Sequence, residues 1–407
     1  MTEYKIILPC YIEIIISELE KQGFECYAVG GCVRDGVMNL PLYDYDLTTN
    51  ASPKQIHEIF EENYKLIDTG IRFGTVTLVA EGHNVEITTF RTESDYTDNR
   101  RPEKIEFSSN LKEDLSRRDF TVNALAYSNR TGLIDCFSGI DDINNKIIRC
   151  IGNPDDRLTD DALRILRALR FSSKLDFSIE EKTKKSLNKN APLLSNISTE
   201  RIYSEINKML SVKNEKRIKT IFDGNRPVFE VIFPEIAVFS DKSYNNFSAS
   251  LSRLSGDSVS CLVYIACKLK FSDKRMSDLK YEKSIKKASD TTSQTLEYLK
   301  KTKLSDTDFM LASANYGEKA VLYAAKIIDA EAGESKYFGK IKDLLDRECV
   351  SLKELAIGGK DLNALGIYGK DVSEILKFLL EAVILKRCRN KPSDLIEYYK
   401  SNYKKRS

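Results

Sequence analysis

The stretch GGCVRD at residues 30–35, followed by YDYDLTT at residues 43–49, decides how the N-terminal third of this sequence is interpreted. Gly30 and Gly31 allow a tight turn, and the amide groups of a helix that starts there can hold phosphate oxygens. Along a strand, side chains two residues apart point to the same face, so residues 43–49 would present two aspartate carboxylates together. Paired carboxylates are typical ligands of two divalent cations, which could activate an attacking oxygen and neutralise a leaving pyrophosphate.

The two carboxylates, Asp44 and Asp46, also have a plain structural interpretation as a hydrated edge strand after an ordinary glycine turn. Their combination with the upstream glycine pair favours a site that binds metal and phosphate. Arg34 then stands where a guanidinium could clamp a triphosphate.

Outward from these stretches, the first 150 residues alternate helix and strand signals. Ser52 and Pro53 fit the N-cap and the first position of a helix, and residues 74–90 read as a β-hairpin. Beyond about Cys150 strand signals become rare, and apolar residues from Leu158 to Phe171 recur at the spacing of one helix. We therefore predict an α/β head followed by an all-helical remainder.

The composition excludes several classes of protein. Sixty-three Lys and Arg against 61 Asp and Glu give a net charge of +2 over 407 residues, so a nucleic-acid surface would have to be local. The only histidines are His57 and His83, which argues against a Ser-His-Asp hydrolase, a His-rich metal site or an appended His-Asp phosphohydrolase. Nine scattered cysteines without a Cys-x-x-Cys pair favour reduced thiols and a cytoplasmic protein. We find neither a signal-peptide pattern nor about 20 consecutive apolar residues, so we expect no membrane segment.

A second polar constellation, RRDFTVNA, occupies residues 117–124. The Asp119 carboxylate could accept a hydrogen bond from a ribose 2′-hydroxyl, which would select ribonucleotides. Arg118 could contact phosphate or base, and Asn123 could fix the turn or the sugar. The structural alternative is an ion pair of Arg118 and Asp119 at the start of a helix.

A third constellation lies in the predicted helix, where Asp160 and Asp161 fall four and three residues before Arg164 and share a face with it. Cytosine and adenine each present an amine donor beside a ring-nitrogen acceptor. One carboxylate and one guanidinium match that edge, whereas uracil and guanine would leave two groups unpaired. A routine salt bridge on the helix surface, worth tenths of a kcal/mol, is the alternative.

Together, GGCVRD and DYDLTTNASP resemble motif A of the class II tRNA nucleotidyltransferases (CCA-adding enzymes) and of the related bacterial poly(A) polymerases. The resemblance implies a head of the DNA polymerase β type, with Asp44 and Asp46 as ligands of two Mg²⁺ ions. Glu86, in VEITTFR, is the candidate third carboxylate, the alternative being a hairpin charge that faces water. Residues 117–124 match the family's motif B throughout.

The predicted helix resembles motif D, usually Glu-Asp-x-x-Arg, the protein template for CTP and ATP. Asp160 stands where the family has Glu, which puts its secondary role of orienting Arg164 in doubt. Residues 95–102 resemble the family's flexible loop, and the alternative is an inert surface loop. Residues 135–152 resemble motif C, a hinge, or else a packed strand–turn–strand, and residues 198–205 resemble motif E, a structural support. The loop residues that we single out are Asp98, Arg100 and Arg101, and the predicted nucleotide-binding residues are Gly30, Gly31, Arg34, Arg118, Asp119, Asn123, Asp160, Asp161, Arg164, Arg167 and Arg170.

The resemblance thus implies an α+β protein: a nucleotidyltransferase head at residues 1–150, then a helical neck (151–212), body (213–352) and tRNA-binding tail (353–407). It implies template-independent addition of C, C and A to the 3′ end of tRNA from CTP and ATP, with the helical part binding the acceptor and TΨC arm. A poly(A) polymerase, an enzyme that adds only the final A, and a catalytically silent RNA-binding protein remain alternatives. The sequence does not indicate an oligomeric state.

Overall fold

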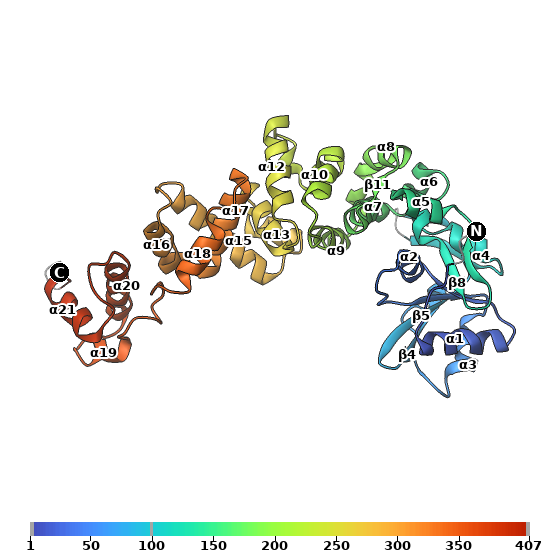
Figure 1. Ribbon diagram of the computed structural model, residues 1–407, viewed down its shortest axis with the longest axis horizontal. Helices are drawn as coiled ribbons and strands as arrows, with labels where there is room; N and C mark the ends of the chain where they lie inside the picture. The colour runs from blue at the N-terminus through green and yellow to red at the C-terminus, as the bar shows by residue number, and fades with distance from the viewer. Residues whose placement is uncertain (1–3, 98–100, 404–407) are drawn as a thin grey trace. The chain divides into compact units, whose positions relative to one another are not determined.

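The computed structural model describes the backbone of residues 4–97 and 101–403 and the side chains of residues 4–92 and 106–403 (Figure 1). The chain divides into two compact units. The first comprises Met1–Met209 with Gly224–Pro234, and the second comprises Leu210–Asp223 with Glu235–Ser407. Each unit is considered by itself.

The first unit is built on a seven-stranded mixed sheet in the order β3-β4-β5-β2-β1-β8-β9. The interior strand β1 is buried along its whole length and pairs antiparallel with both β2 and β8, whereas β2 pairs parallel with β5. The predicted hairpin is confirmed as β4 and β5. The bounds of the strands are β1 Cys26–Val29, β2 Asp46–Thr49, β3 Lys65–Ile67, β4 Thr75–Ala80, β5 His83–Thr89, β8 Leu125–Ser128 and β9 Gly132–Asp135; β6 Arg91–Thr97 and β7 Arg101–Phe107 form a separate ribbon.

Five helices accompany these strands, among them α1 (Cys10–Lys21), α4 (Leu111–Ser116) and α5 (Gly139–Asn145). Helix α1 buries one apolar stripe, as helical spacing requires, and contacts β1 and α3 (Pro53–Phe60). Ser52 caps α3 in a capping box with Gln55, and Pro53 occupies its first turn, so the predicted start of this helix is confirmed. Helix α2 (Gly31–Val37) begins directly after β1 and contacts β1 and β8.

The rest of the first unit is mainly helical: α6 Pro154–Asp160, α7 Leu163–Leu175, α8 Glu181–Asn190, α9 Thr199–Leu210 and α11 Arg226–Ile232. The single helix predicted over 158–171 is wrong, because the chain breaks between α6 and α7. Asp161 is extended (φ −137°, ψ 103°), and its Oδ1 accepts the N–H of Leu163 at 3.0 Å. An aspartate that binds the backbone two residues on competes with helix propagation, which accounts for the break.

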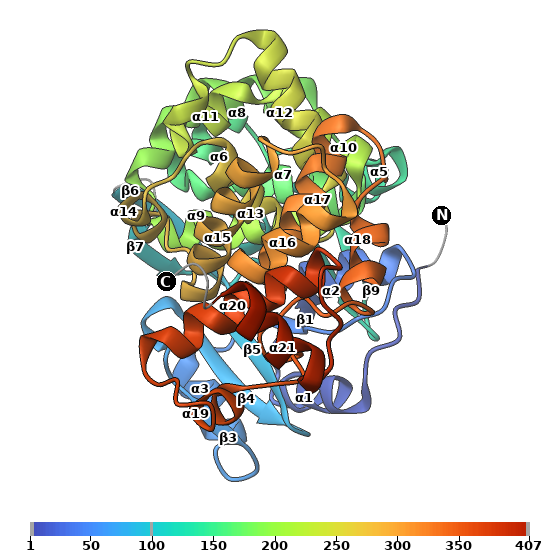
Figure 2. The same cartoon turned by 90° about the vertical axis from the view of Figure 1, so that its left-hand side faces the viewer.

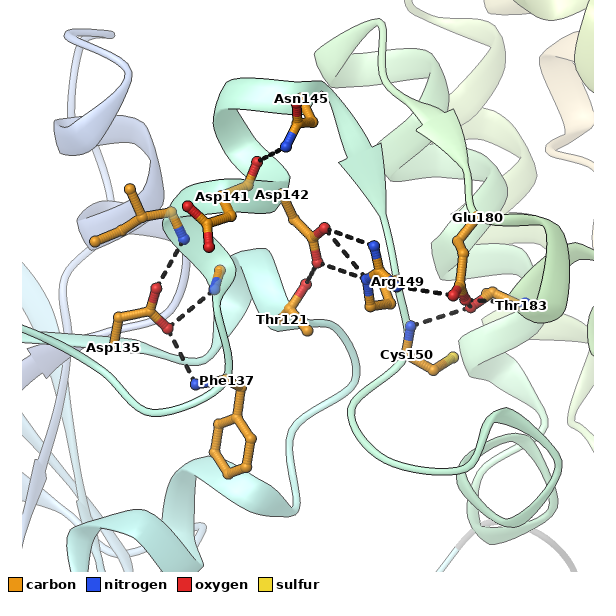
Figure 3. Close-up of polar contacts among 12 residues, drawn as sticks. Thr121, Asp135, Phe137, Asp141, Asp142, Asn145, Arg149, Cys150, Glu180 and Thr183 are labelled. Atoms are coloured by element: carbon orange, nitrogen blue, oxygen red, sulfur yellow. Dashed lines mark hydrogen bonds and ion pairs between the residues drawn. The ribbon is translucent and has the colours of Figure 1, made fainter.

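Arg149 joins the sheet-bearing segments to the helices that follow (Figure 3). Its guanidinium donates to Asp142 on α5 at 3.0–3.2 Å and to Glu180, the N-cap of α8, at 2.8 Å. Asp142 also accepts from the Thr121 hydroxyl at 2.6 Å. The short strands β10 (Ile147–Ile148) and β11 (Ser178–Ile179) pair in parallel beside this contact. These hydrogen bonds, ion pairs and strand pairing hold the region resembling motif C to the helices that follow it.

The second unit contains no strand among its described residues, which agrees with the predicted all-helical remainder. Buried side chains such as Phe309, Val321 and Leu379 form its core. Near its end, α19 and α21 both contact α20 (Figures 1 and 2). No helix in the described part of the chain is long and apolar enough to cross a membrane. The remaining helices are α10 Glu215–Gly224, α12 Asp241–Arg253, α13 Ser258–Lys268, α14 Asp273–Asp278, α15 Lys283–Leu299, α16 Asp306–Tyr316, α17 Glu318–Ala332, α18 Phe338–Leu345, α19 Gly359–Asn363, α20 Lys370–Ile384 and α21 Pro392–Asn402.

The packing of α5 generates a stability prediction. A Cβ at Gly139 would lie 2.3 Å from the carbonyl oxygen of Thr121, a backbone atom that cannot yield without moving the RRDFTVNA segment. We expect Gly139→Ala to lower the free energy of unfolding by about 1–3 kcal/mol, the usual cost of overpacking. Gly339→Ala is the control, since it lies in α18 with open space around it and should stabilise by about 0.5–1 kcal/mol through helix propensity. Urea unfolding of both variants measures the two effects, and equal stabilities would contradict the packing.

Candidate active site

One polar cavity of about 850 Å³ in the first unit collects most of the predicted site residues. It is bounded by the start of α2, the segment before β2, the RRDFTVNA segment, α7 and α9. Asp44, Asp46, Glu86 and all the predicted nucleotide-binding residues except Asp160 line it. The lining residues are Gly30, Gly31, Cys32, Arg34, Asp35, Leu42, Tyr43, Asp44, Asp46, Glu86, Arg117, Arg118, Asp119, Asn123, Asp161, Arg164, Arg167, Arg170, Phe171, Lys174 and Lys208.

The three predicted catalytic carboxylates face this cavity from neighbouring strands. Asp46 begins β2 and is the register partner of Glu86 on β5, and partners in a parallel pair project from the same face of a sheet. Asp44 lies two residues before Asp46, outside the strand, so the predicted strand over both aspartates is shorter than expected. The alternation still holds, because Tyr45 between them is buried while Asp44 and Asp46 are exposed to the cavity.

Electrostatics around Asp46 favour a bound cation. Enclosure by the protein raises the pKa of the Asp46 carboxyl, and the negative charges of Glu86 and Asp44 raise it further against the opposing charge of Arg118. Oxygen-only carboxylate donors suit Mg²⁺, and a cation would relieve this repulsion. In the described residues no three His, Cys, Asp or Glu side chains already form a metal-binding cluster, so a cation would have to draw the carboxylates together.

The turn after β1 requires glycine at residue 30, both for its backbone conformation and for the space that its neighbours leave. Gly30 has φ 74°, a conformation that costs other residues, and a Cβ there would lie 3.2 Å from Nη1 of Arg118. Arg34, one turn on, is only 2% exposed and is held by Asp35 (Nη2–Oδ1 2.6 Å) and Asn123 (Nη1–Oδ1 2.5 Å). Its guanidinium therefore forms part of the cavity wall with its partners already in place.

Asp119 is the most heavily bonded carboxylate of the site. One oxygen accepts from the N–H of Phe120 (2.8 Å) and from Asn123 Nδ2 (2.9 Å), and the other pairs with Arg167 Nε (2.8 Å) and Nη2 (2.6 Å). Burial by itself would raise its pKa, but Arg167, the Asn123 hydrogen bond and the charge of Arg164 outweigh it and lower the pKa to about 2. All four acceptor positions are filled, so a ribose hydroxyl would have to displace one of these donors.

Asp114 holds the two arginines of the RRDFTVNA segment. This fully buried carboxylate pairs with Arg117 (Nη2–Oδ1 2.8 Å) and Arg118 (Nη2–Oδ2 3.3 Å) and also accepts from the Thr48 hydroxyl on β2 (3.2 Å). The Nε of Arg118 is buried and has no hydrogen-bond partner among the described atoms. Asp114 lies outside the motifs, and nothing in the sequence distinguishes it from other acidic residues.

The predicted base-reading pair, Asp161 and Arg164, lies at the break between α6 and α7. Asp161 accepts from Arg201 Nη2 on α9 at 3.1 Å, and Arg164 donates to the carbonyls of Arg157 (3.1 Å) and Arg117 (3.0 Å). Both side chains line the cavity. Asp160 does not line the cavity, and its Oδ2 lies 3.5 Å from Nη1 of Arg157 and 3.8 Å from Nη1 of Arg164.

The predictions for the loop mostly fall outside the described structure. Asp98 and Arg100 lie outside the described residues, and Arg101 begins β7 with its side chain undescribed. Several lining residues were missed. Asp35 and Arg117 lie within the quoted motifs and could have been included on that ground. Cys32 and Tyr43 also lie within the quoted stretches, whereas Leu42, Phe171, Lys174 and Lys208 reach the cavity only through the fold.

Comparison with known proteins agrees with the motifs. The Poly A polymerase head domain matches residues 26–149, the RNA- and SrmB-binding site of polymerase A matches 176–239, and tRNA nucleotidyltransferase domain 2 matches 258–399. The CCA-adding enzyme of Ligilactobacillus salivarius is 36% identical over 97% of this chain and 96% of its own length. The chain belongs to the CCA-adding enzymes. The resemblance found in the sequence is thereby confirmed.

Other members of the family cover the chain equally well. The CCA-adding enzyme of Pediococcus pentosaceus is 36% identical over 94% of this chain and 95% of its own length. The crystal structure of the Bacillus stearothermophilus CCA-adding enzyme in complex with CTP superposes with a TM-score of 0.73 at 26% identity, over 98% of this chain and all of that one. The Thermotoga maritima enzyme complexed with tRNA has the same fold, with a TM-score of 0.72 at 22% identity. Like its relatives, this nucleotidyltransferase has a polymerase-β-type head and a helical remainder, so the predicted fold class is confirmed.

The bonding of Asp119 generates a pH prediction. Because its folded pKa of about 2 lies below the ordinary value of 3.8, its ionised form stabilises the fold above pH 4, and this contribution disappears as the pH falls through 2. The shift corresponds to roughly 2 kcal/mol. We expect Asp119→Asn to be less stable than the parent by a constant amount from pH 7 to 5, with the gap narrowing between pH 4 and 2. Urea unfolding across this range measures the gap, and a gap independent of pH would refute the assignment.

Proposed function

We propose that this protein adds C, C and A to the 3′ end of tRNA from CTP and ATP, without a nucleic-acid template, and releases pyrophosphate. The observation that carries the proposal is the shared cavity. It brings the carboxylates at β2 and β5 together with the base-reading pair Asp161 and Arg164 from the neck. A member of the CCA-adding family with both parts facing one space has what the reaction needs, a phosphoryl-transfer centre and a protein template.

Asp44, Asp46 and Glu86 would hold two Mg²⁺ ions in this proposal. Bound there, the ions would supply charge to activate the 3′-hydroxyl of the RNA and to neutralise the leaving pyrophosphate. The protein's own contribution is placement: the β2–β5 register fixes Asp46 beside Glu86, and Tyr45 anchors the segment that carries Asp44. Arg118, whose charge already acts on Asp46, faces the same space and can bind a phosphate oxygen.

Asp161 and Arg164 would read the base. Asp161 uses one acceptor position on each oxygen for Arg201 and Leu163, which leaves the other positions for an exocyclic amine of cytosine or adenine. Arg164 spends two of its five N–H groups on backbone carbonyls, and the others can donate to the ring nitrogen of the base. The contacts already made fix both side chains, so the selection does not depend on mobile groups.

Recognition of tRNA falls to the helical part in this proposal. The predicted neck (151–212), body (213–352) and tail (353–407) would contact the acceptor and TΨC arm mainly through backbone and shape, as A-form RNA is usually bound. We place the enzyme in the cytoplasm, and its nine free cysteines accord with a reducing compartment.

Incorporation into defined primers tests the function. Transcripts of one tRNA that lack the last three nucleotides, or only the final A, are incubated with CTP, ATP or both and Mg²⁺. We expect the first primer to grow by three nucleotides and stop when both nucleotides are present. A ladder of A residues would identify a poly(A) polymerase, and extension of only the primer ending in CC would identify an enzyme specific for A. UTP and GTP should be incorporated poorly, since the base-reading pair mismatches both.

Substitution of a metal ligand separates catalysis from RNA binding. We expect Asp44→Ala to abolish incorporation while tRNA affinity and melting temperature stay close to the parent's, because the carboxylate acts on the cation and not on the fold. Asp68→Ala is the control: this exposed head carboxylate pairs with His57 and should leave incorporation unchanged. Full activity of Asp44→Ala would refute the metal assignment, and an inactive parent that still binds tRNA would indicate a silent RNA-binding protein.

A further inference from the structure

The ring of Phe171 stands among three guanidinium groups of the cavity wall. Their central carbons lie 4.3 Å (Arg170), 5.2 Å (Arg34) and 5.3 Å (Arg167) from the ring centroid. Arg34 comes from α2 in the head, and the other two come from α7 in the neck, as does Phe171. Cations within about 6 Å of an aromatic face are attracted by its quadrupole. One neutral side chain thus touches three of the positive charges that line the cavity.

Each guanidinium is also tied to its own carboxylate. Besides the pairs Arg34–Asp35 and Arg167–Asp119, Arg170 Nε lies 2.6 Å from Oε2 of the buried Glu205 on α9. Like charges gathered around one ring repel each other. Burial lowers the pKa of Arg170, and the positive charge of Arg167 lowers it further. The negative charge of Glu205 opposes both effects without cancelling them. The ring and the carboxylates together are what allow the three cations to stay close.

The contacts form a closed circuit through the wall. Arg34 donates to Asn123, Asn123 donates to Asp119, Asp119 pairs with Arg167, and Arg167 and Arg34 both meet the ring of Phe171. Every member lines the cavity. A change at the ring would therefore remove a contact that Arg34 on α2 and Arg167 on α7 share.

We propose that Phe171 is a positioning residue that sets the guanidinium groups of Arg167 and Arg170 to receive the triphosphate of the incoming nucleotide. The inference deepens the proposed function and rests on it. Guanidiniums match phosphate oxygens by paired N–H donation, and a third of the Arg167 side chain is exposed (34%), so it has donors to offer. Lys174 and Lys208 add positive charge to the same cavity.

The proposal separates the phosphate part of the ligand from the base part. The hydrogen bonds that hold the base-reading pair come from Arg201 and the Leu163 N–H and go to the backbone carbonyls of Arg157 and Arg117, and the ring takes no part in them. Simple packing is the competing explanation, since Phe171 is 6% exposed and packs edge-to-face on Phe120 at 5.9 Å. Packing would predict a general loss of stability, whereas positioning predicts a selective loss of affinity for polyphosphate.

Variants of the full-length chain distinguish the two explanations. For Phe171→Leu we expect the KM for CTP and for ATP to rise about 5- to 20-fold, with the KM for tRNA unchanged. The inhibition constant of inorganic tripolyphosphate should rise by the same factor, and that of cytidine should not change. Phe171→Tyr, which keeps the ring, should restore both constants. Phe60→Leu removes a fully buried ring of α3 far from this wall and is the matched control for lost packing.

A volume-conserving series keeps the test valid if Phe171→Leu folds poorly. Site-specific replacement of Phe171 by phenylalanines with one, two and three ring fluorines weakens the quadrupole stepwise with little change in shape. Tripolyphosphate binding, measured by calorimetry without RNA, should weaken with each fluorine. Constant affinity across the series, or an equal loss for cytidine, would overturn the inference. Since binding is measured directly, failure here is distinct from failure to add CCA to tRNA, which the primer assay reports.

Discussion

The ion pair between Asp119 and Arg167 is the contact on which the site depends, because it joins the RRDFTVNA segment to α7 inside the cavity. Isolated, either charge would be costly to enclose, and a buried ion pair by itself is weak evidence of stability. Here each partner has further neutral or charged contacts: Asn123 and the N–H of Phe120 for the carboxylate, and the Phe171 ring for the guanidinium. The ion pair therefore contributes mainly to the positions of the two segments and less to the stability of the fold. It fixes the distance between the RRDFTVNA segment, which leads into β8, and α7, which carries Arg164.

The sheet supplies the second constraint. β2 lies between β1 and β5, so Asp46 has Val29 opposite it on one side and Glu86 on the other. Because β1 runs into the Gly30 turn, the same strand that pairs with β2 also leads into α2 and Arg34. Asp114 connects this edge to the RRDFTVNA segment through Thr48 and both arginines. The residues that we propose for metal, phosphate and base binding are thus positioned by one sheet and by the two buried carboxylates beside it, Asp114 and Asp119.

Much of this site was predictable because its chemistry is concentrated in short motifs. The informative residues lie within a few positions of one another in the glycine pair, the two aspartates and RRDFTVNA. The cavity brings these motifs together as expected. The misjudged features are short-range contacts of two neighbouring aspartates, which hydrophobic periodicity does not reveal. Periodicity predicts one helix through Asp161, but the carboxylate of that residue bonds the backbone ahead of it and breaks the helix. Asp160 contacts Arg157 and Arg164 and does not line the cavity. The roles of the individual site residues stay predictions.

By itself the sequence determined the class of the protein, an α/β head with a helical remainder, and the residue types of its chemistry, because hydrophobic periodicity and motif spacing are local properties. Only the tertiary structure decided that Glu86 is the partner of Asp46, that Asp114 and Asp119 hold the arginines, and that Phe171 faces three of them. The pairs Asp46–Glu86, Asp119–Arg167 and Arg34–Phe171 are far apart in the sequence, and strand register and helix packing, which no local pattern encodes, bring them together.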